Sequence, residues 1–285
     1  MQFVSARTIE EAVAALAGAS GPAHVLAGGT DLIVQMTSGL RQPEVVVDIK
    51  TIPELKKITQ DDNGFHIGAA VSGADISEHE ALIAAWPGVV EAMDIIGSMQ
   101  VQSKATPAGN LCNASPAGDS VPAMIAAGAT ATIVGPEGKR EVPVEQIPVG
   151  PGRTSLKKGE VIVAINLPPR MGRAADAYVR FTPRTEMDIA VVGVGVNITL
   201  NEAGVCTAAR VGVGAVAPTA LLVPEAGEAL VGTRLDDAAL DKAAAAVRAA
   251  CKPIDDKRGT AEYRIEISGV IFKRAAATAL ARAQA

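Results

Sequence analysis

Short apolar stretches alternate with helical stretches over the first 50 residues of the chain. Residues 8–11 (TIEE) have the spacing of a capping box, and the helical stretch after them ends at a glycine. Residues 23–27 predict a strand, which two glycines end, and residues 31–39 predict a short helix. The β-branched run over residues 44–49 is typical of a strand that is covered on both faces. The order helix, strand, helix, strand predicts a small α/β unit.

The pattern changes to hairpins and longer helical stretches after residue 53. Two alternating stretches on either side of Asp62-Asn63-Gly64 predict a β-hairpin, and a second hairpin is predicted to turn at residues 135–138. Between them, residues 77–98 predict helices with a break at Pro87-Gly88, and residues 159–167 predict a strand. This combination of helices and hairpins is typical of an α+β unit rather than a doubly wound sheet.

Residues 168–177 are rich in proline, glycine and arginine and are the best candidate for a domain boundary. After this segment, residues 188–200 and 204–216 predict neighbouring strands, and residues 236–250 and 268–283 predict helices. The expected fold class is therefore α+β, with a two-part domain followed by an antiparallel α+β domain. The expected boundaries are 1–174 for the first domain, with parts at about 1–54 and 55–174, and 175–285 for the second.

The composition argues against several classes of protein. The chain has 285 residues, a net charge of −5 and only 2% aromatic residues, which gives no electrostatic footprint or stacking platform for nucleic acid. No stretch approaches the roughly 20 apolar residues of a transmembrane helix, and no signal peptide is visible, so we expect a cytoplasmic protein. Cys112, Cys206 and Cys251 are too few and too far apart for an iron–sulfur cluster, and we expect no metal site.

Gly28 and Gly29 stand where the second predicted element meets the third. Glycine lets a backbone approach a ligand closely, and free amides at a helix N-terminus favour phosphate. Thr30 adds a hydroxyl, whereas Asp31 would repel a phosphate and is expected to cap the helix or to meet a sugar hydroxyl. The residues alone leave two interpretations open, a nucleotide phosphate site and an ordinary strand–turn–helix connection.

Residues 105–120 contain many small side chains and predict a second loop, too long for one tight turn. Such a loop is usually functional, although an exposed flexible loop is the alternative. Leu111 and Cys112 in its middle argue against full exposure. The polar side chains that it offers are Thr106, Asn110, Asn113, Ser115 and Asp119.

Other motifs of nucleotide or catalytic sites are absent from the sequence. Gly193-Val-Gly195 and Gly212-Val-Gly214 lack a third glycine and a following helix, so they indicate a closely packed sheet rather than a dinucleotide fingerprint. There is no P-loop, no nucleophile elbow and no zinc spacing among the three histidines. No residue is therefore expected to act as a catalytic acid, base or nucleophile.

The two glycine loops together, LAGGTDLI and TPAGNLCNASPAGDS, resemble the FAD-binding medium subunits of molybdenum hydroxylases, the family of xanthine dehydrogenase and aerobic carbon monoxide dehydrogenase. The resemblance covers nearly the whole chain. It includes the strand EVIVAINLPP and the tail DDKRGTAEYRIEISGVIFKRA, which is similar to the family's C-terminal flavoprotein domain.

The resemblance implies a set of FAD-binding residues. The first loop and Thr30 would hold the pyrophosphate, Thr106 to Asn110 would hold it from the other side, and Asp119 would contact the nucleotide part. The family usually has Thr-Ile-Gly-Gly-Asn in the second loop, so Pro107 and Ala108 are departures, and the amides of Gly109 and Asn110 are expected to carry the contact. The implied residues are Leu26, Ala27, Gly28, Gly29, Thr30, Asp31, Leu32, Ile33, Ile96, Thr106, Ala108, Gly109, Asn110, Ser115, Asp119, Ile162 and Arg180.

The resemblance also implies the role of FAD-carrying electron-transfer subunit. Electrons from substrate oxidation at a large molybdopterin subunit would pass through the [2Fe–2S] clusters of a small subunit to FAD, and then to NAD⁺, a quinone or another acceptor. Both subunits are expected partners, in a dimer of heterotrimers. Two alternatives remain: a stand-alone FAD-dependent oxidoreductase that uses Arg184, Glu186 and Asp188, and a scaffold that binds a nucleotide or nothing.

Overall fold

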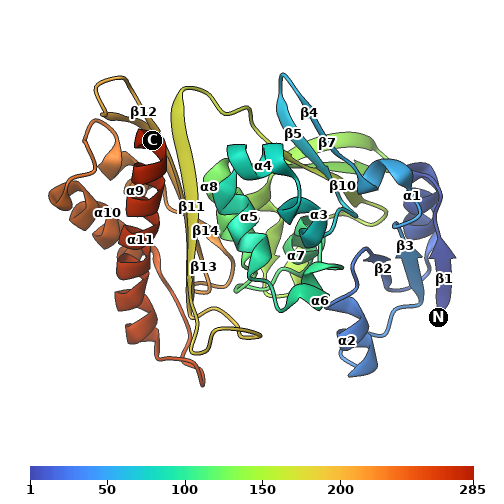
Figure 1. Cartoon of the computed structure of the whole chain (residues 1–285). Helices are drawn as coiled ribbons and strands as arrows, with labels where there is room; N and C mark the ends of the chain where they lie inside the picture. Colours follow the sequence, from blue (N-terminus) through green and yellow to red (C-terminus); the bar gives the residue numbers. More distant parts are fainter.

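The N-terminal unit is a three-stranded parallel sheet in the order β1-β3-β2, seen at one end of the computed structural model, which describes residues 1–285 (Figure 1). All four residues of the central strand β3 (Val45–Asp48) are buried, as its β-branched run predicts. Strand β2 (Ala23–Leu26) pairs with it in parallel. The predicted α/β unit is confirmed, but strand β1 (Gln2–Ser5) was not predicted, because it is a short edge strand with little burial.

Helix α1 (Ile9–Gly18) begins after Thr8, whose hydroxyl accepts a hydrogen bond from the amide of Glu11. The Glu11 carboxylate in turn accepts from the amide of Arg7, 2.7 Å away. The predicted capping box is therefore present in a variant form, in which the return bond goes to the residue before the cap. Helix α2 (Leu32–Thr37) is followed by Gly39 at a φ of +77°, in agreement with the predicted end of this helix.

The middle of the chain forms a five-stranded antiparallel sheet in the order β4-β5-β10-β6-β7. Both predicted hairpins are confirmed, and the predicted strand β10 lies between them at the centre. Strands β8 and β9 form a separate two-stranded sheet. The bounds are Ile58–Asp61 for β4, Gly64–Gly68 for β5, Thr130–Gly135 for β6, Gly138–Pro143 for β7, Pro148–Gly150 for β8, Arg153–Thr154 for β9 and Val161–Leu167 for β10.

Short helices lie in the same part of the chain as this sheet. The predicted break at Pro87 is confirmed, because helix α5 begins there. The helices are η1 (Pro53–Lys56), α3 (Gly73–Ser77), α4 (Glu80–Ala85), α5 (Pro87–Asp94), α6 (Met99–Gln102), α7 (Pro107–Asn113), α8 (Ser120–Ala127) and η2 (Val144–Gln146).

The prediction of a long loop over residues 105–120 is wrong, because helix α7 occupies its first half. Thr106 caps this helix by accepting a hydrogen bond from the amide of Gly109 at 2.9 Å. Pro107 stands at the first helical position, where the amide that proline lacks has no partner within the helix. Leu111 is fully buried and anchors the helix to the core. Local capping and burial thus outweigh the low helix propensity of this composition.

The C-terminal part is a four-stranded antiparallel sheet in the order β11-β12-β13-β14. The two predicted neighbouring strands are confirmed as β12 and β13. Strand β11 begins at Arg173, within the segment 168–177 in which we expect the domain boundary. Helix α11 begins earlier than predicted, after a Thr260 cap. The bounds are Arg173–Phe181 for β11, Val192–Leu200 for β12, Cys206–Gly214 for β13, Leu221–Leu222 for β14, Pro224–Leu230 for α9, Asp237–Ala250 for α10 and Ala261–Gln284 for α11.

Helices cover both faces of this last sheet (Figure 1). Helix α11 packs on one face, and α5 and α8 of the preceding part pack on the other. A Cβ atom at Gly195 or Gly212 would lie 2.6 or 2.1 Å from the carbonyl oxygen of Pro122 in α8, so only glycine allows this close approach. The prediction that these glycines belong to a closely packed sheet is confirmed.

The chain has two large hydrophobic clusters. The larger, of 36 buried residues, is built almost entirely from residues 6–167, and the smaller, of 27, from residues 175–283. None of the helices is long and apolar enough to cross a membrane.

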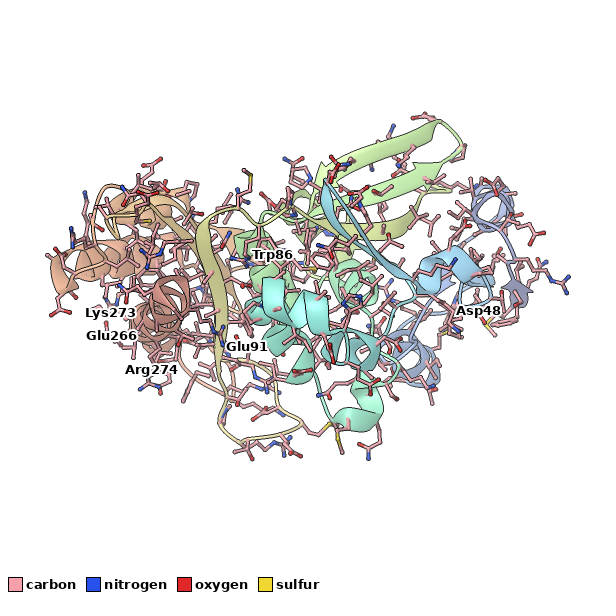
Figure 2. All side chains as sticks on the ribbon, turned by 45° about the horizontal axis from the view of Figure 1, so that its top comes forward. Asp48, Trp86, Glu91, Glu266, Lys273 and Arg274 are labelled. Carbon is pink, nitrogen blue, oxygen red and sulfur yellow. The ribbon has the colours of Figure 1, made fainter.

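A polar network joins the two clusters. The Arg170 guanidinium lies 3.8 Å above the ring of Trp86 and pairs with buried Asp176 at 2.6 Å. Glu91 on α5 pairs with Arg282 on α11. Figure 2 shows Trp86 and Glu91 where the α4–α5 region meets strand β11. The two parts are therefore held together by specific contacts as well as by packing.

Candidate functional site

A cavity of about 440 Å³ lies between the N-terminal sheet, helix α7 and the start of β10. This volume is within the usual range for small-molecule and cofactor sites, roughly 300–1,000 Å³. Three separate segments, 27–32, 105–113 and 152–162, supply most of its walls. The structure therefore brings the two glycine-containing segments of the sequence together at one cavity.

The first segment presents a row of free backbone donors. The amides of residues 28–32 have no hydrogen-bond acceptor anywhere in the chain, whereas the next amide, of Ile33, donates to the carbonyl of Gly29 at 3.0 Å. Five consecutive donors without a protein acceptor are a candidate anion-binding surface, because the oxygens of a ligand can accept from them. The chemistry of this surface suits the oxygens of a phosphate or diphosphate.

Gly28 and Gly29 are each required to be glycine, but for different structural reasons. A Cβ atom at Gly28 would lie 1.8 Å from the backbone oxygen of Lys104, so the first segment passes directly against the chain that leads into α7. Gly29 has a φ of +77°, which glycine adopts without strain. The glycine pair thus creates both the turn and the contact between the two walls.

Helix α7 contributes to the cavity in a different way from the one expected. The amides of Gly109 and Asn110, expected to hold the diphosphate, donate to the hydroxyl and the carbonyl of Thr106, both at 2.9 Å. The amides of Thr106 and Ala108 are the ones left without an acceptor. Apart from the Thr106 hydroxyl, nothing lies within 4 Å of a Cβ atom at Gly109. Gly109 therefore opens this wall rather than donating from it.

Asp31 lines the cavity but does not cap α2, so the cap expected of it is wrong. Its carboxylate makes no hydrogen bond within the chain, and partial burial raises its pKa above the ordinary value. A carboxylate in this position disfavours further negative charge beside it. A sugar hydroxyl is a more suitable partner for it than a phosphate oxygen.

The cavity also has basic residues that the sequence did not indicate. His24, Arg41, Lys157 and Lys158 line it. Burial and the positive charge of Arg41 lower the pKa of His24. These residues belong to no recognisable motif and lie up to 134 positions apart (158 − 24), so only the fold shows that they share a site.

The expected residues divide into two groups. Ala27 to Leu32, Ile96, Thr106, Ala108 to Asn110 and Ile162 line the cavity. The remaining five do not: Leu26, Ile33, Ser115, Asp119 and Arg180.

Asp119 and Arg180 form a separate buried cluster with Tyr178. The Asp119 carboxylate accepts hydrogen bonds from the Tyr178 hydroxyl and from Arg180, each at 2.9 Å. Burial raises the pKa of Asp119, although both partners act in the opposite direction. The carboxylate is thus already satisfied by the protein itself.

The charged group 184–188 also lies away from the cavity. Arg184 donates to the carbonyl of Met187, and Asp188 pairs with Arg258 at 3.3 Å. These contacts fix the β11–β12 connection. No observation places the group beside a substrate pocket.

Two family descriptions together match almost the entire chain. Residues 1–170 match the FAD binding domain in molybdopterin dehydrogenase, and residues 177–279 match the CO dehydrogenase flavoprotein C-terminal domain. The chain belongs to the FAD-binding medium subunits of molybdenum hydroxylases. These subunits are oxidoreductase components, and their cofactor is FAD.

Individual relatives agree with this membership. The chain is 36% identical to the carbon monoxide dehydrogenase medium chain of Afipia carboxidovorans, over 98% of this chain and 96% of that protein. It is 28% identical to the xanthine dehydrogenase FAD-binding subunit of Escherichia coli O157:H7, over 98% and 95%. A solved carbon monoxide dehydrogenase from Hydrogenophaga pseudoflava superposes with a TM-score of 0.95 at 33% identity, covering 99% of this chain and 98% of that one.

The cavity fits FAD by its donor chemistry. Its row of free amides matches a diphosphate, and its basic residues match the negative charge of that group. Apolar residues such as Leu16, Ile96 and Ile162 offer surface to aromatic rings. No cluster of three or more histidine, cysteine, aspartate or glutamate side chains suited to a metal ion occurs in the structure.

Proposed function

We propose that this chain is the FAD-carrying electron-transfer subunit of a molybdenum-containing hydroxylase complex. It would stand between the [2Fe–2S] clusters of a small subunit and a final acceptor such as NAD⁺ or a quinone. The observation that carries the proposal is the row of five free amides at residues 28–32, in a chain of this family. Bound FAD would supply the redox chemistry, because it can exchange electrons with one-electron and two-electron partners.

The protein's own part is binding and orientation. The amides of residues 28–32 would hold the diphosphate, and Thr30 would add a hydroxyl. Gly109 would leave room for the cofactor on the facing wall, while Asn110 and Ala108 line it. We propose a less direct role for Asp119 and Arg180. Their ion pair would fix the start of α8 to strand β11.

We also propose that the chain divides at about residue 174 into a cofactor-binding domain and a C-terminal domain. The two hydrophobic clusters support this division, as do the two family matches. The partners would be a small [2Fe–2S] subunit and a large molybdopterin subunit, in a dimer of heterotrimers. The medium-chain names of the relatives support an assembly of unequal subunits. The three free cysteines fit a cytoplasmic location, where thiols stay reduced.

Purification of the full chain with its co-expressed partners tests the proposal. We expect a yellow complex with one FAD per chain, which a dye reduces only when all three subunits and a substrate are present. A colourless chain that added FAD neither binds nor stabilises would contradict the proposal. A yellow chain that turns over a substrate alone would favour a stand-alone oxidoreductase.

A further inference from the structure

We propose that Arg41 is the cation that neutralises the diphosphate of the bound cofactor, and that Gln35 and Gly152 hold its guanidinium in place. The proposal rests on the proposed function, since it assigns a residue to the same cavity. Arg41 follows helix α2 and lies outside both glycine-containing segments. It is a binding residue that no motif of the sequence indicated.

The guanidinium of Arg41 has neutral partners only. Its Nε donates to the side-chain oxygen of Gln35 at 2.6 Å, and one terminal nitrogen donates to the carbonyl of Gly152 at 3.3 Å. The other terminal nitrogen has no partner, and no carboxylate lies within ion-pair distance. A half-buried guanidinium without a counter-charge is costly, because its charge is only partly solvated. An anionic ligand would remove this cost.

The other charged side chains of the cavity do not fill this role. Lys157 pairs with Glu137 at 2.8 Å, and Glu160 forms a two-pronged ion pair with Arg140. Lys158 has no partner but is exposed, so solvent and salt screen its charge. Arg41 is thus the half-buried cation of the cavity whose charge the protein leaves uncompensated.

The partners of Arg41 also link the walls of the cavity. Gln35 on α2 accepts from Arg41 and donates its amide group to Asn113 on α7 at 2.9 Å. Gly152 comes from the connection between β8 and β9, and its amide donates to the carbonyl of Ala114 at 3.0 Å. The guanidinium is therefore held directly by α2 and by the β8–β9 connection, and it is linked to α7 through Gln35. A group held in this way loses little freedom when it binds a phosphate.

The test measures FAD binding by apoprotein of the full chain, from the quenching of flavin fluorescence, at several salt concentrations. Arg41→Gln removes the charge and should weaken FAD binding by at least about tenfold and reduce its salt dependence. Arg41→Lys keeps the charge without the planar fork, so it should weaken binding less and keep the salt dependence. Gln35→Leu releases the guanidinium and should also weaken binding, with the salt dependence kept.

Arg274→Gln is the matched control, because Arg274 is exposed on α11, in the half of the molecule away from the cavity (Figure 2). It should bind FAD as the wild type does. Circular dichroism of each variant checks the fold, and if Arg41→Gln fails to fold, Arg41→Lys decides, since wild-type affinity there contradicts the role of the fork. Wild-type affinity and salt dependence in folded Arg41→Gln would overturn the inference. A wild-type chain that does not bind FAD would instead overturn the proposed function.

Discussion

At the scale of single residues, the glycines of the cavity are not interchangeable. A side chain at Gly28 would meet the backbone at Lys104, whereas one at Gly109 would meet the Thr106 hydroxyl at 2.8 Å and otherwise open space. Valine at Gly28 would therefore push the two cavity walls apart. Valine at Gly109 would instead fill part of the open space in which we propose that the cofactor lies.

We predict that Gly109→Val weakens FAD binding by at least about tenfold and leaves the circular dichroism spectrum of the apoprotein unchanged. Gly18→Val is the control, because nothing lies within 4 Å of a Cβ atom there. Equilibrium titration with FAD measures both variants. Full affinity in Gly109→Val would show that the cofactor does not pass this wall.

The cavity-lining residues that stand in contiguous motifs could be predicted from the sequence, and those outside such motifs could not. Gly28 and Thr106 were found because each stands in a recognisable run. Arg41 and Lys158 were missed, since an isolated basic side chain in a connection carries no local signal. The free amides of residues 28–32 also required the structure, because a sequence does not show which donors lack acceptors.

At the scale of elements, helix α7 depends on its cap. Thr106 is 3% exposed, and its hydroxyl accepts from the Gly109 amide. We predict that Thr106→Val lowers the free energy of unfolding by about 1 kcal/mol, whereas Thr106→Ser keeps most of the stability. Urea unfolding of the apoprotein measures both. Equal stability of the valine variant and the wild type would mean that the cap contributes nothing.

A ladder of polar side chains crosses four strands of the five-stranded sheet, β4, β5, β10 and β6. His66 on β5 faces the side-chain oxygen of Asn166 at 2.9 Å and a carboxylate oxygen of Asp61 at 3.1 Å. The amide group of Asn166 donates to Thr132, which fixes its oxygen toward His66. Both ring nitrogens thus face acceptors, which favours the charged imidazolium. The hydrogen bond with Asn166, and then that with Asp61, raise the pKa of His66 against the opposing effect of burial.

The sign of the pH effect follows from this raised pKa. The ladder contributes stability below the unfolded-state pKa of about 6.5, and this contribution is lost as the pH rises through the higher folded-state pKa. We predict that His66→Gln lowers the free energy of unfolding at about pH 6 by on the order of 0.5 kcal/mol, and by less at about pH 9. A difference that stays constant with pH would contradict this assignment.

The elements themselves were predicted where local chemistry decides them. The valine run of β3 and the Asn63-Gly64 turn each specify one conformation. Strand β1 and helix α7 were not predicted, because β1 is defined by its partner β3 and α7 by the burial of Leu111. Tertiary packing overrides composition in both cases.

At the scale of the whole molecule, the joint between the two hydrophobic clusters depends on a buried ion pair. Burial raises the pKa of Asp176 to about 6, with Arg170 as the main opposing influence. Removing Arg170 would leave this buried carboxylate without its ion-pair partner. We predict that Arg170→Ala lowers the free energy of unfolding by about 3–5 kcal/mol.

Trp86 reports on this joint, since it is the chain's single tryptophan and Arg170 lies over its ring. Tryptophan fluorescence during urea unfolding measures the effect, with Arg274→Gln as the control. Arg170→Lys should be less damaging, because it keeps the charge but not the stacking. An unchanged unfolding midpoint in Arg170→Ala would show that the ion pair does not hold the two parts together.

The α+β class and the order of the elements followed from the sequence, but the cavity did not. Its walls come from residues as distant as Leu16 and Ile162, and their meeting is a property of the packed sheets. The resemblance of the sequence to the FAD-binding family implied the cofactor. The structure shows which backbone amides in the cavity lack a hydrogen-bond acceptor. The proposed FAD site thus depends most on the free amides of one short segment, residues 28–32.

Hydrogen–deuterium exchange of the full chain, with and without FAD, tests that segment most directly. We predict that saturating FAD slows exchange in the peptide that spans residues 28–32 and leaves exchange in α10 unchanged. Binding of one FAD per chain with no protection of residues 28–32 would contradict the central claim that these amides hold the diphosphate.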